Sequence, residues 1–379
     1  MNVLMTYRLQ AFNTEILPQL NRYQNDNVVF IVKNNYIKNL LPILIKRYKL
    51  DVKINILTVE ELLEGKIDNM KFDYIVGNPP YQTVTGETTK LIWDKIIIKA
   101  YKLLKNGGEM NMLHPGGWRF ADDNSKKNIR EVRKIYNENN IDMELHDCVD
   151  GFEMFNSFTD FDIVKLYKEP RNRKTKIKTK NNEVTLDISK YGVLPTDRYD
   201  LFFSLVADKD EKHVQILNDY SYGSDDRFTH VSKIKNSLFK YPVVYGMPDY
   251  GINFLYSNTR DKGHFGIPKL IIAKAGYISL LDLKGEYGMT QYGFGLIDEP
   301  ENLVRLQKAI ENPKFKCLKN LFLGLGESNG RNAFTDNRGH MFKFLKEFRK
   351  DFWKEFYTPE MEQELINEGK LDEEGRYIG

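Results

Sequence analysis

The run Asn78-Pro79-Pro80-Tyr81 contains the residue types in this sequence that are best suited to chemistry. The two prolines fix φ and have no N–H, so carbonyls near them remain free acceptors. The side chain of Asn78 adds another carbonyl oxygen. Together these acceptors can hold both hydrogens of an exocyclic amine, such as adenine N6, and aim its lone pair at a methyl donor. Tyr81 offers a flat ring for the base, so catalysis would come from positioning and needs no strong base.

The turn directly follows residues 72–76, an apolar run with the composition of a buried strand. This strand belongs to a longer alternating pattern, which predicts a doubly wound, mainly parallel, Rossmann-like α/β sheet. In such a sheet, ligands bind beyond the carboxyl ends of the strands. Pro42 interrupts the first helical pattern and is expected near a helix start. The other expected strands are residues 28–32, 53–57, 109–113, 143–148 and 161–167, and the expected helices are 36–48, 91–104 and 125–139.

Composition limits the class of protein. With 379 residues, of which 41% are hydrophobic, the chain has enough apolar material for about two domains. The two cysteines, Cys148 and Cys317, suit a reducing compartment, and the six histidines form no pair at ligand spacing, so no metal centre is expected. No apolar run reaches the ~18 residues that span a bilayer. We therefore expect a cytoplasmic protein with no membrane association.

The character of the sequence changes after Tyr167, and we expect domains at residues 1–168 and 169–379. The second half has short apolar runs broken by Gly, Pro and Asn, which predicts a mixed, strand-rich domain with a helical C-terminal tail. At the boundary lies a basic cluster that is either a set of DNA phosphate contacts or a solvated hairpin or loop. Its members are Arg171, Arg173, Lys174, Lys176, Lys178 and Lys180.

The segment from Phe72 to Gln82 resembles the catalytic segment of restriction–modification methyltransferases that act on adenine in DNA. The likeness continues through residues 91–95, 103–108 and 114–119, and it covers residues 28–167 of the chain. It implies transfer of a methyl group from S-adenosylmethionine to a flipped adenine in double-stranded DNA. It also implies that Asn78 and Pro79 hold the amine, that Tyr81 stacks on the base, and that the protein has a bacterial or phage origin.

In the family that this segment resembles, a second aromatic ring from a later loop closes the other face of the base. Residues 155–161 are the matching region here, and Phe158 is the residue we select. The alternative is that Phe158 is an ordinary core residue. A target-recognition domain would follow the catalytic one, as the composition change after Tyr167 suggests.

The cofactor side of the pattern is less complete. The family opens with a strand and a glycine-rich turn, but residues 1–26 contain no glycine, and the first strand is expected to be missing. After the strand at 28–32, Asn34 takes the place of the acid that binds the ribose, and it is equally well a turn residue. Glu61 fits the acid that reads the adenine of the cofactor, or a solvated first-turn glutamate. Gly324 and Gly326, in a late Phe-x-Gly-x-Gly run, are interpreted as loop residues.

Three functions stay open at this point. The first is a DNA adenine methyltransferase, active alone or with a second subunit that supplies the missing cofactor elements, and associated with a restriction endonuclease. The second is a catalytically degenerate DNA-binding protein on the same fold. The third is a methyltransferase that acts on RNA or on a protein glutamine, because those families share the Asn-Pro-Pro-Tyr turn.

Overall fold

The computed structural model describes most of the chain, which divides into two compact units, Met1–Asp197 and Arg198–Gly379. The described residues are 2–6, 26–47, 54–85, 88–123, 125–218, 221–222, 230–247, 251–273, 278–323 and 341–379.

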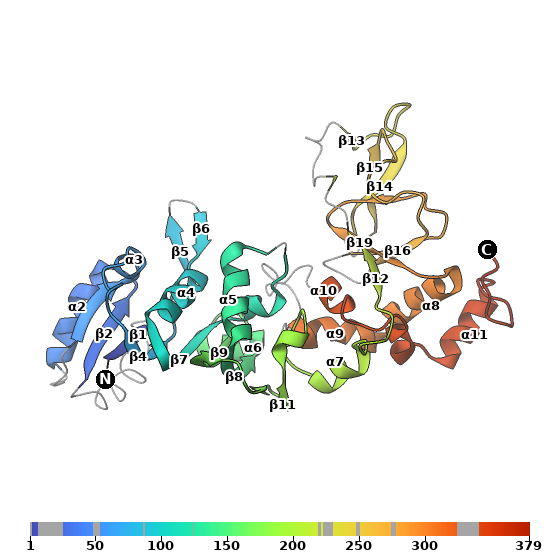
Figure 1. Ribbon diagram of the computed structural model, residues 1–379. Coiled ribbons are helices and arrows are strands. Elements are labelled where there is room, and N and C mark those ends of the chain that lie inside the picture. The colour runs from blue at the N-terminus through green and yellow to red at the C-terminus, as the bar shows by residue number, and fades with distance from the viewer. Residues whose placement is uncertain are drawn as a thin grey trace. The chain divides into compact units, whose positions relative to one another are not determined.

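The first unit is built on a nine-stranded sheet in the order β11-β10-β8-β9-β7-β4-β1-β2-β3 (Figure 1). From β3 to β7 all neighbours run parallel, whereas β9 runs antiparallel to both β7 and β8. The predicted doubly wound, mainly parallel sheet is therefore confirmed. Its strands are β1 (Asn2–Thr6), β2 (Asn27–Val32), β3 (Ile54–Thr58), β4 (Phe72–Gly77), β7 (Leu104–Pro115), β8 (Asn139–His146), β9 (Phe161–Pro170), β10 (Thr175–Lys178) and β11 (Glu183–Leu186).

Helices and one small hairpin connect these strands. Pro42 lies inside the first helix, α2, and not near its start as expected. An exposed position accounts for this, because water can satisfy the carbonyl that loses its helical partner there. The connecting elements are α2 (Asn35–Arg47), α3 (Val59–Leu63), the hairpin β5 (Gln82–Thr85) and β6 (Thr88–Leu91), α4 (Trp93–Leu103), η4 (Gly116–Phe120), α5 (Lys127–Glu138), α6 (Cys148–Phe155) and η5 (Ile188–Lys190).

The expectation that the first strand is missing is wrong. β1 pairs in parallel with β2 on one side and with β4 on the other, in the middle of the five parallel strands β7-β4-β1-β2-β3. Val3, Leu4 and Met5 are fully buried. The sequence patterns missed this strand because its apolar run, Val3 to Met5, is only three residues long. The turn that follows it lies outside the described residues.

The expected boundary at residue 168 is also wrong. β9 continues past it to Pro170, and the basic cluster forms β10, which adds to the same sheet by pairing with β8. β11 then folds back on β10 as an antiparallel hairpin. The first unit therefore ends at Asp197. The boundary depends on pairing of β10 with β8 and of β11 with β10, which joins strands far apart in sequence. A local change in composition cannot show such pairing.

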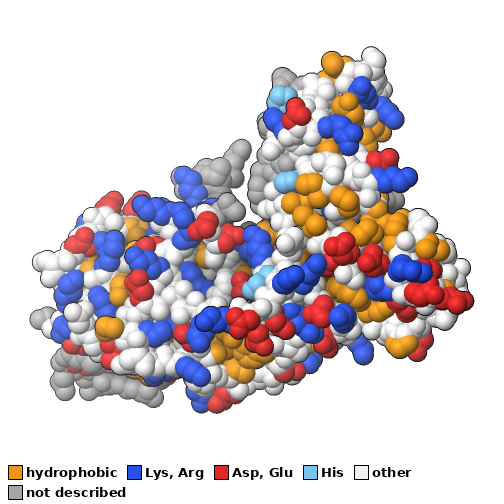
Figure 2. All heavy atoms as spheres, turned by 45° about the vertical axis from the view of Figure 1, so that its right-hand side comes forward, with side chains coloured by type: hydrophobic (Ala, Val, Ile, Leu, Met, Phe, Trp, Pro, Cys, Tyr) orange, Lys and Arg blue, Asp and Glu red, His pale blue; other side chains and the backbone are white. Residues whose placement is uncertain are grey.

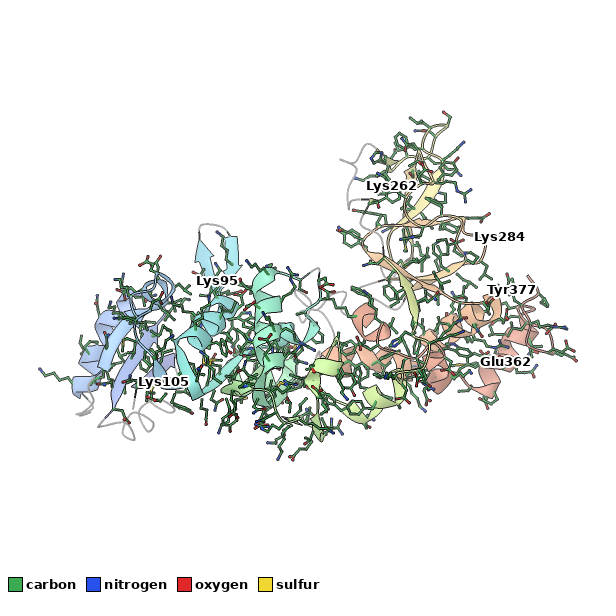
Figure 3. The ribbon with its side chains drawn as sticks, viewed as in Figure 1. Lys95, Lys105, Lys262, Lys284, Glu362 and Tyr377 are labelled. Atoms are coloured by element: carbon green, nitrogen blue, oxygen red, sulfur yellow. The ribbon has the colours of Figure 1, made fainter. Side chains whose placement is uncertain are left out.

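The second unit contains two four-stranded sheets, of orders β12-β19-β16-β17 and β13-β15-β14-β18, together with helices. Lys269 and Asp282 form an ion pair between β16 and β17 at 2.7 Å, with both side chains buried. Arg305 on α8 donates to Glu362 on α11 at 2.6 Å. Figure 3 labels Glu362. The elements of the second unit are α7 (Tyr199–Leu205), β12 (Gln215–Leu217), β13 (Val231–Ser232), β14 (Tyr241–Gly246), β15 (Asn253–Ser257), β16 (Lys269–Ala273), β17 (Ser279–Asp282), β18 (Gly288–Met289), β19 (Gly293–Ile297), α8 (Pro300–Glu311), α9 (Pro313–Leu323), α10 (Met341–Leu345), η6 (Phe352–Phe356) and α11 (Pro359–Asn367).

The predicted mixed, strand-rich second half with helices in its tail agrees with this arrangement. Gly324 and Gly326, interpreted from sequence as loop residues, lie outside the described part of the chain. Among the helices that the structure describes, none has the length and apolar character needed to cross a membrane.

Candidate active site

The turn Asn78–Tyr81 leaves the carboxyl end of β4, one of the central parallel strands. Gly77, the last residue of β4, is paired with Thr6 of β1 and with Met112 of β7. Pro79 and Pro80 are buried, and Asn78 is half-buried. The Oδ1 atom of Asn78 is shielded from solvent and accepts no hydrogen bond from any residue that the structure describes. The turn therefore presents a fixed acceptor without a donor at the edge where an open α/β sheet binds ligands.

The β5–β6 hairpin returns the chain to its starting point and fixes Tyr81. The backbone oxygen of Tyr81 accepts hydrogen bonds from the N–H groups of Ile92 (3.1 Å) and Trp93 (3.5 Å). These two residues lie at the start of α4, beside the hairpin (Figure 1). Positive partial charge at a helix N-terminus suits a carbonyl oxygen. Tyr81 is half-buried.

Buried aromatic rings pack against the start of α4. Trp93 stacks on His114 with the ring centroids 5.0 Å apart, and His114 Nε2 lies 2.7 Å from the hydroxyl of Tyr136. Burial lowers the pKa of His114 to about 4, and the charge of Arg119 contributes. The ring is therefore neutral at pH 7. Since the Pro115 oxygen, 3.0 Å from Nδ1, can only accept, Nδ1 carries the proton and Nε2 accepts from Tyr136.

Phe158 lies in the loop between α6 and β9, at the same edge of the sheet as the Asn78 turn. The register shows this, because β7 runs three residues beyond Met112 to Pro115, which pairs with Phe161 at the start of β9. The ring of Phe158 is 38% exposed and stacks on Phe152 of α6 at 4.3 Å. Phe158 is therefore partly exposed at the same edge of the sheet as the turn and is not a core residue, which leaves it available to a ligand at this edge.

Glu61 is committed to local structure. Its carboxylate accepts from the backbone N–H of Thr58 at 2.8 Å, which completes a capping box at the start of α3. It also pairs with Lys38 and Lys66, both at 2.7 Å. The hydrogen bond from Lys38, followed by that from Lys66, lowers the pKa of Glu61 to about 2. Glu61 was interpreted either as the acid that binds the adenine of a cofactor or as a glutamate in the first turn of a helix. The contacts of its carboxylate support the second interpretation.

Asn34 follows β2 and is exposed. Its Oδ1 accepts from the N–H of Ile37 at 3.2 Å, so it caps the start of α2. Its Nδ2 has no acceptor among the described residues and remains able to donate. Asn34 is thus both a turn residue and a possible donor to a hydroxyl group.

The six basic residues at 171–180 lie on and around β10, in the β10–β11 hairpin. A hairpin was one of the two interpretations of this cluster, and a set of phosphate contacts was the other. Four of them are neutralised by acids: Arg171 by Asp187, Arg173 by Asp142, Lys176 by Glu183 and Lys178 by Glu144. Lys174 and Lys180 are exposed and have no ion pair among the residues that the structure describes. On the face shown in Figure 2, basic and acidic side chains alternate, with no continuous basic surface.

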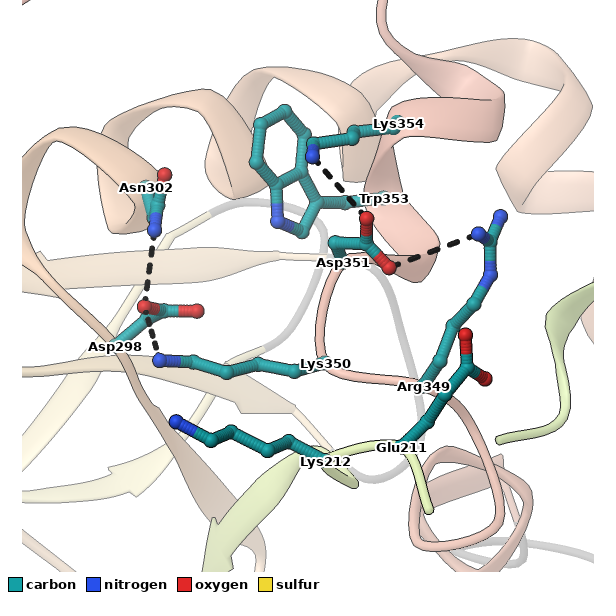
Figure 4. Close-up of a pocket in the computed structure, with 9 residues that line it drawn as sticks. All are labelled: Glu211, Lys212, Asp298, Asn302, Arg349, Lys350, Asp351, Trp353 and Lys354. Atoms are coloured by element: carbon teal, nitrogen blue, oxygen red, sulfur yellow. Dashed lines mark hydrogen bonds and ion pairs between the residues drawn. The ribbon is translucent and has the colours of Figure 1, made fainter. Parts of the chain in front are cut away.

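The second unit contains a pocket of about 270 Å³ whose charged groups largely pair with one another. Lys350 pairs with Asp298 at 2.8 Å, and Lys354 pairs with Asp351 at 3.1 Å (Figure 4). A pocket whose charges are matched in this way does not select a charged ligand. No group of three potential metal ligands occurs within the described ranges.

Arg119 has no role in the sequence analysis, but its side chain makes several buried hydrogen bonds. Its side chain is fully buried and donates to Asp160, Asp162 and Thr196. Burial raises the pKa of Asp162 to about 6, although the charge of Arg119 opposes that shift. The only sequence signal was the presence of Asp160 and Asp162 on either side of an apolar residue at a strand start.

Strand order and the position of the turn together define the first unit as a Rossmann-like α/β domain with its candidate site at the carboxyl ends of the parallel strands. Residues 4–155 match the model of the Eco57I restriction-modification methylase family. A Mycoplasma pneumoniae (strain ATCC 29342 / M129 / Subtype 1) protein described as an uncharacterized adenine-specific methylase is 26% identical over 198 residues, which are 50% of this chain and 45% of that protein. The chain thus spans less than half of this relative. Residues 4–155 are therefore similar in sequence to methylases of the restriction–modification type.

Two solved structures are similar to about half of the chain. One is the methyltransferase subunit of a type I restriction-modification system from Streptococcus thermophilus, with 17% identity, a TM-score of 0.35, and coverage of 49% of this chain and 46% of that one. The other is the M protein of the type I restriction enzyme EcoKI, with 12% identity, a TM-score of 0.35, and coverage of 47% and 44%. Similarity at this level does not define fold or function, so the assignment rests on the sequence family.

Proposed function

We propose that the protein is a DNA adenine-N6 methyltransferase that uses S-adenosylmethionine. One observation carries the proposal: Asn78 Oδ1 is buried and has no donor among the described residues, at the end of a central parallel strand and next to two buried prolines. A buried acceptor without a partner costs about 1–3 kcal/mol. That cost is recovered when an amine donates to it, and adenine N6 supplies such an amine.

In this mechanism Asn78 Oδ1 accepts one N6 hydrogen and the backbone oxygen of Pro79 accepts the other. Both hydrogen bonds draw the nitrogen lone pair out of conjugation with the ring and toward the incoming methyl group. Tyr81 stacks on one face of the flipped base, and Phe158 closes the other face. These contacts offset the few kcal/mol that base flipping costs. As the N6–CH3 bond forms, the S–CH3 bond of the sulfonium would break and the donor would leave as a neutral thioether. N6 then carries one methyl group and has lost one proton to water.

The donor would lie beside β1 and β2, at the same edge of the sheet. When bound, S-adenosylmethionine supplies an electrophilic methyl group on a sulfonium. Among the described residues, Asn34 fits a contact with it, because its uncommitted Nδ2 can donate to a ribose hydroxyl. Glu61 does not fit, since two lysines and a backbone N–H already occupy its carboxylate.

DNA contact is proposed for both parts of the chain. Lys174 and Lys180, the two members of the basic cluster without an ion pair in the described ranges, are suited to backbone phosphates. The second unit is proposed as the target-recognition unit. A restriction endonuclease, or a subunit that completes the cofactor site, is the proposed protein partner.

The test is transfer of label from S-adenosylmethionine to separate samples of double-stranded DNA, RNA and protein, followed by nuclease digestion and mass spectrometry. We expect N6-methyladenine in the DNA sample, and none with the Asn78→Ala variant. Label confined to RNA or to glutamine would instead support the third function left open by the sequence.

A catalytically degenerate DNA-binding protein is the second candidate. Two observations favour it: residues 1–26 contain no glycine, and Glu61 is committed to structure. Calorimetric titration separates the two candidates. If S-adenosylmethionine does not bind the chain with or without DNA, while DNA alone does bind, the degenerate protein is the correct reading.

A further inference from the structure

The guanidinium of Arg119 joins two segments that are far from it in sequence. At the start of β9, Nη2 donates to Asp160 Oδ2 at 3.0 Å and Nε donates to Asp162 Oδ2 at 3.1 Å. At the end of the first unit, Nη1 donates to Thr196 Oγ1 at 2.8 Å and to the Leu194 oxygen at 3.3 Å. The planar fork of arginine fixes such contacts in direction as well as in distance.

The contact with Asp160 depends on a neighbouring glycine. A Cβ added at Gly116 would strike the guanidinium of Arg119 and would lie 2.6 Å from Asp160 Oδ2. Trp118, in the same η4 turn, donates from Nε1 to Asp162 at 2.8 Å. The sequence of η4 is thus suited to bringing one arginine and two aspartates together in a space that solvent does not reach.

Asp160 is the last residue of the loop that carries Phe158. At the other end of this loop, Asn156 takes a left-handed conformation with φ 53° and ends α6. A Cβ on Gly151 of α6 would strike the carbonyl oxygen of Thr159, so the helix packs directly on the loop backbone. The loop is therefore held from one side by α6 and from the other by the ion pair with Arg119.

We propose that Arg119 is a positioning residue for methyl transfer, which fixes Asp160 and thereby holds residues 157–159 and the ring of Phe158 at the edge of the Asn78 turn. The inference rests on the proposed function, because it assigns the ring a place on the target base. Arg119 itself does not touch the base. Its effect is on the geometry of the base and not on binding of the methyl donor.

The test compares two conservative variants that each remove one partner of the same guanidinium. Asp160→Asn keeps the size of the side chain but loses the ion pair to the loop. Thr196→Val keeps the shape and loses the hydrogen bond to the end of the first unit. Three quantities are measured for each: kcat, KM for S-adenosylmethionine, and amide hydrogen exchange across residues 156–160.

For Asp160→Asn we expect kcat to fall about 10- to 100-fold, because small misplacements of reacting groups cost that much. KM for S-adenosylmethionine should stay unchanged, and the loop amides should exchange faster. For Thr196→Val we expect wild-type kcat and wild-type exchange in the loop. The inference is overturned if Asp160→Asn leaves both loop exchange and kcat unchanged, or if the two variants lose kcat and melting temperature equally, since Arg119 would then be a structural residue only.

A substitute variant and a second readout cover the cases in which the main comparison cannot be made. If Asp160→Asn does not fold, Gly116→Ala presses on the same ion pair and is judged by the same three quantities. If the wild-type protein methylates nothing, the proposed function fails, whereas loop exchange in the two variants still shows whether Arg119 holds the loop. Unchanged loop exchange in an active Asp160→Asn variant with normal kcat refutes the inference alone.

Discussion

Replacement of Asn78 by alanine should move activity and stability in opposite directions. Asn78 Oδ1 is buried and lacks a donor among the described residues, so the folded protein bears the cost of an unsatisfied acceptor. That cost is about 1–3 kcal/mol, and alanine removes it. The half-buried side chain gives up some packing in exchange, so a net gain of about 1 kcal/mol in unfolding free energy is expected.

In a unit of 197 residues, 1 kcal/mol corresponds to a rise in melting temperature of about 2–4 °C. Activity should fall, because the same oxygen would hold the amine in the transition state. Loss of one such preorganised contact costs about 100- to 1000-fold in kcat. Scanning calorimetry on the full chain measures the first effect, and transfer of labelled methyl groups to DNA measures the second.

Asn137 provides a matched control. It is half-buried, and its Oδ1 is also buried without a partner in the described part of the chain, but it lies near the end of α5. The next residues begin β8, whose far end, His146, faces the edge with the Asn78 turn. Asn137→Ala should therefore raise the melting temperature without reducing kcat. The reasoning is refuted if Asn78→Ala destabilises the protein by more than about 1 kcal/mol, or if Asn137→Ala lowers kcat as strongly as Asn78→Ala does.

Three other outcomes are expected. Tyr81→Phe should retain activity within a few-fold, because the ring face is kept, whereas Tyr81→Ala should raise KM for DNA about 10- to 100-fold through lost base stacking; steady-state kinetics decide this. The lowered pKa of Glu61 means that its contribution to stability is present above its ordinary value of 4.5 and is lost as the pH falls toward about 2. Glu61→Gln should therefore lower the melting temperature at pH 7 and match the wild type near pH 2, with unchanged affinity for S-adenosylmethionine by calorimetry. Lys269→Met should leave Asp282 buried without its cation and cost about 3–5 kcal/mol in denaturant unfolding; a loss below about 1 kcal/mol would contradict the buried ion pair.

Local sequence patterns determined the class of fold and the place of the turn. Buried strands have continuous apolar runs, and strand–helix alternation restricts the sheet to a parallel, doubly wound one. Asn78–Tyr81 sits where the pattern put it, at the end of β4. Phe158 was selected from the family resemblance alone. Its place at this edge follows from the antiparallel pairing of β9 with β7, which the sequence did not predict.

Only the tertiary structure decided the features that depend on pairing between distant residues. β1 has only three apolar residues in a row, Val3 to Met5, and its identity as the middle parallel strand comes from its partners on both sides. The end of the first unit at Asp197 depends on β10 pairing with β8. Glu61 had two readings until the capping box and two lysines were seen around it.

Arg119 shows the physical reason most directly. Its hydrogen bonds reach partners 41, 43 and 77 residues away, and they form in a space that solvent does not enter. A sequence read locally reports which side chains prefer to be buried, but an arginine gives no sign of which carboxylates will accompany it. The chain by itself therefore determined the chemistry of the Asn78 turn. The fold decided which groups hold the loop beside it.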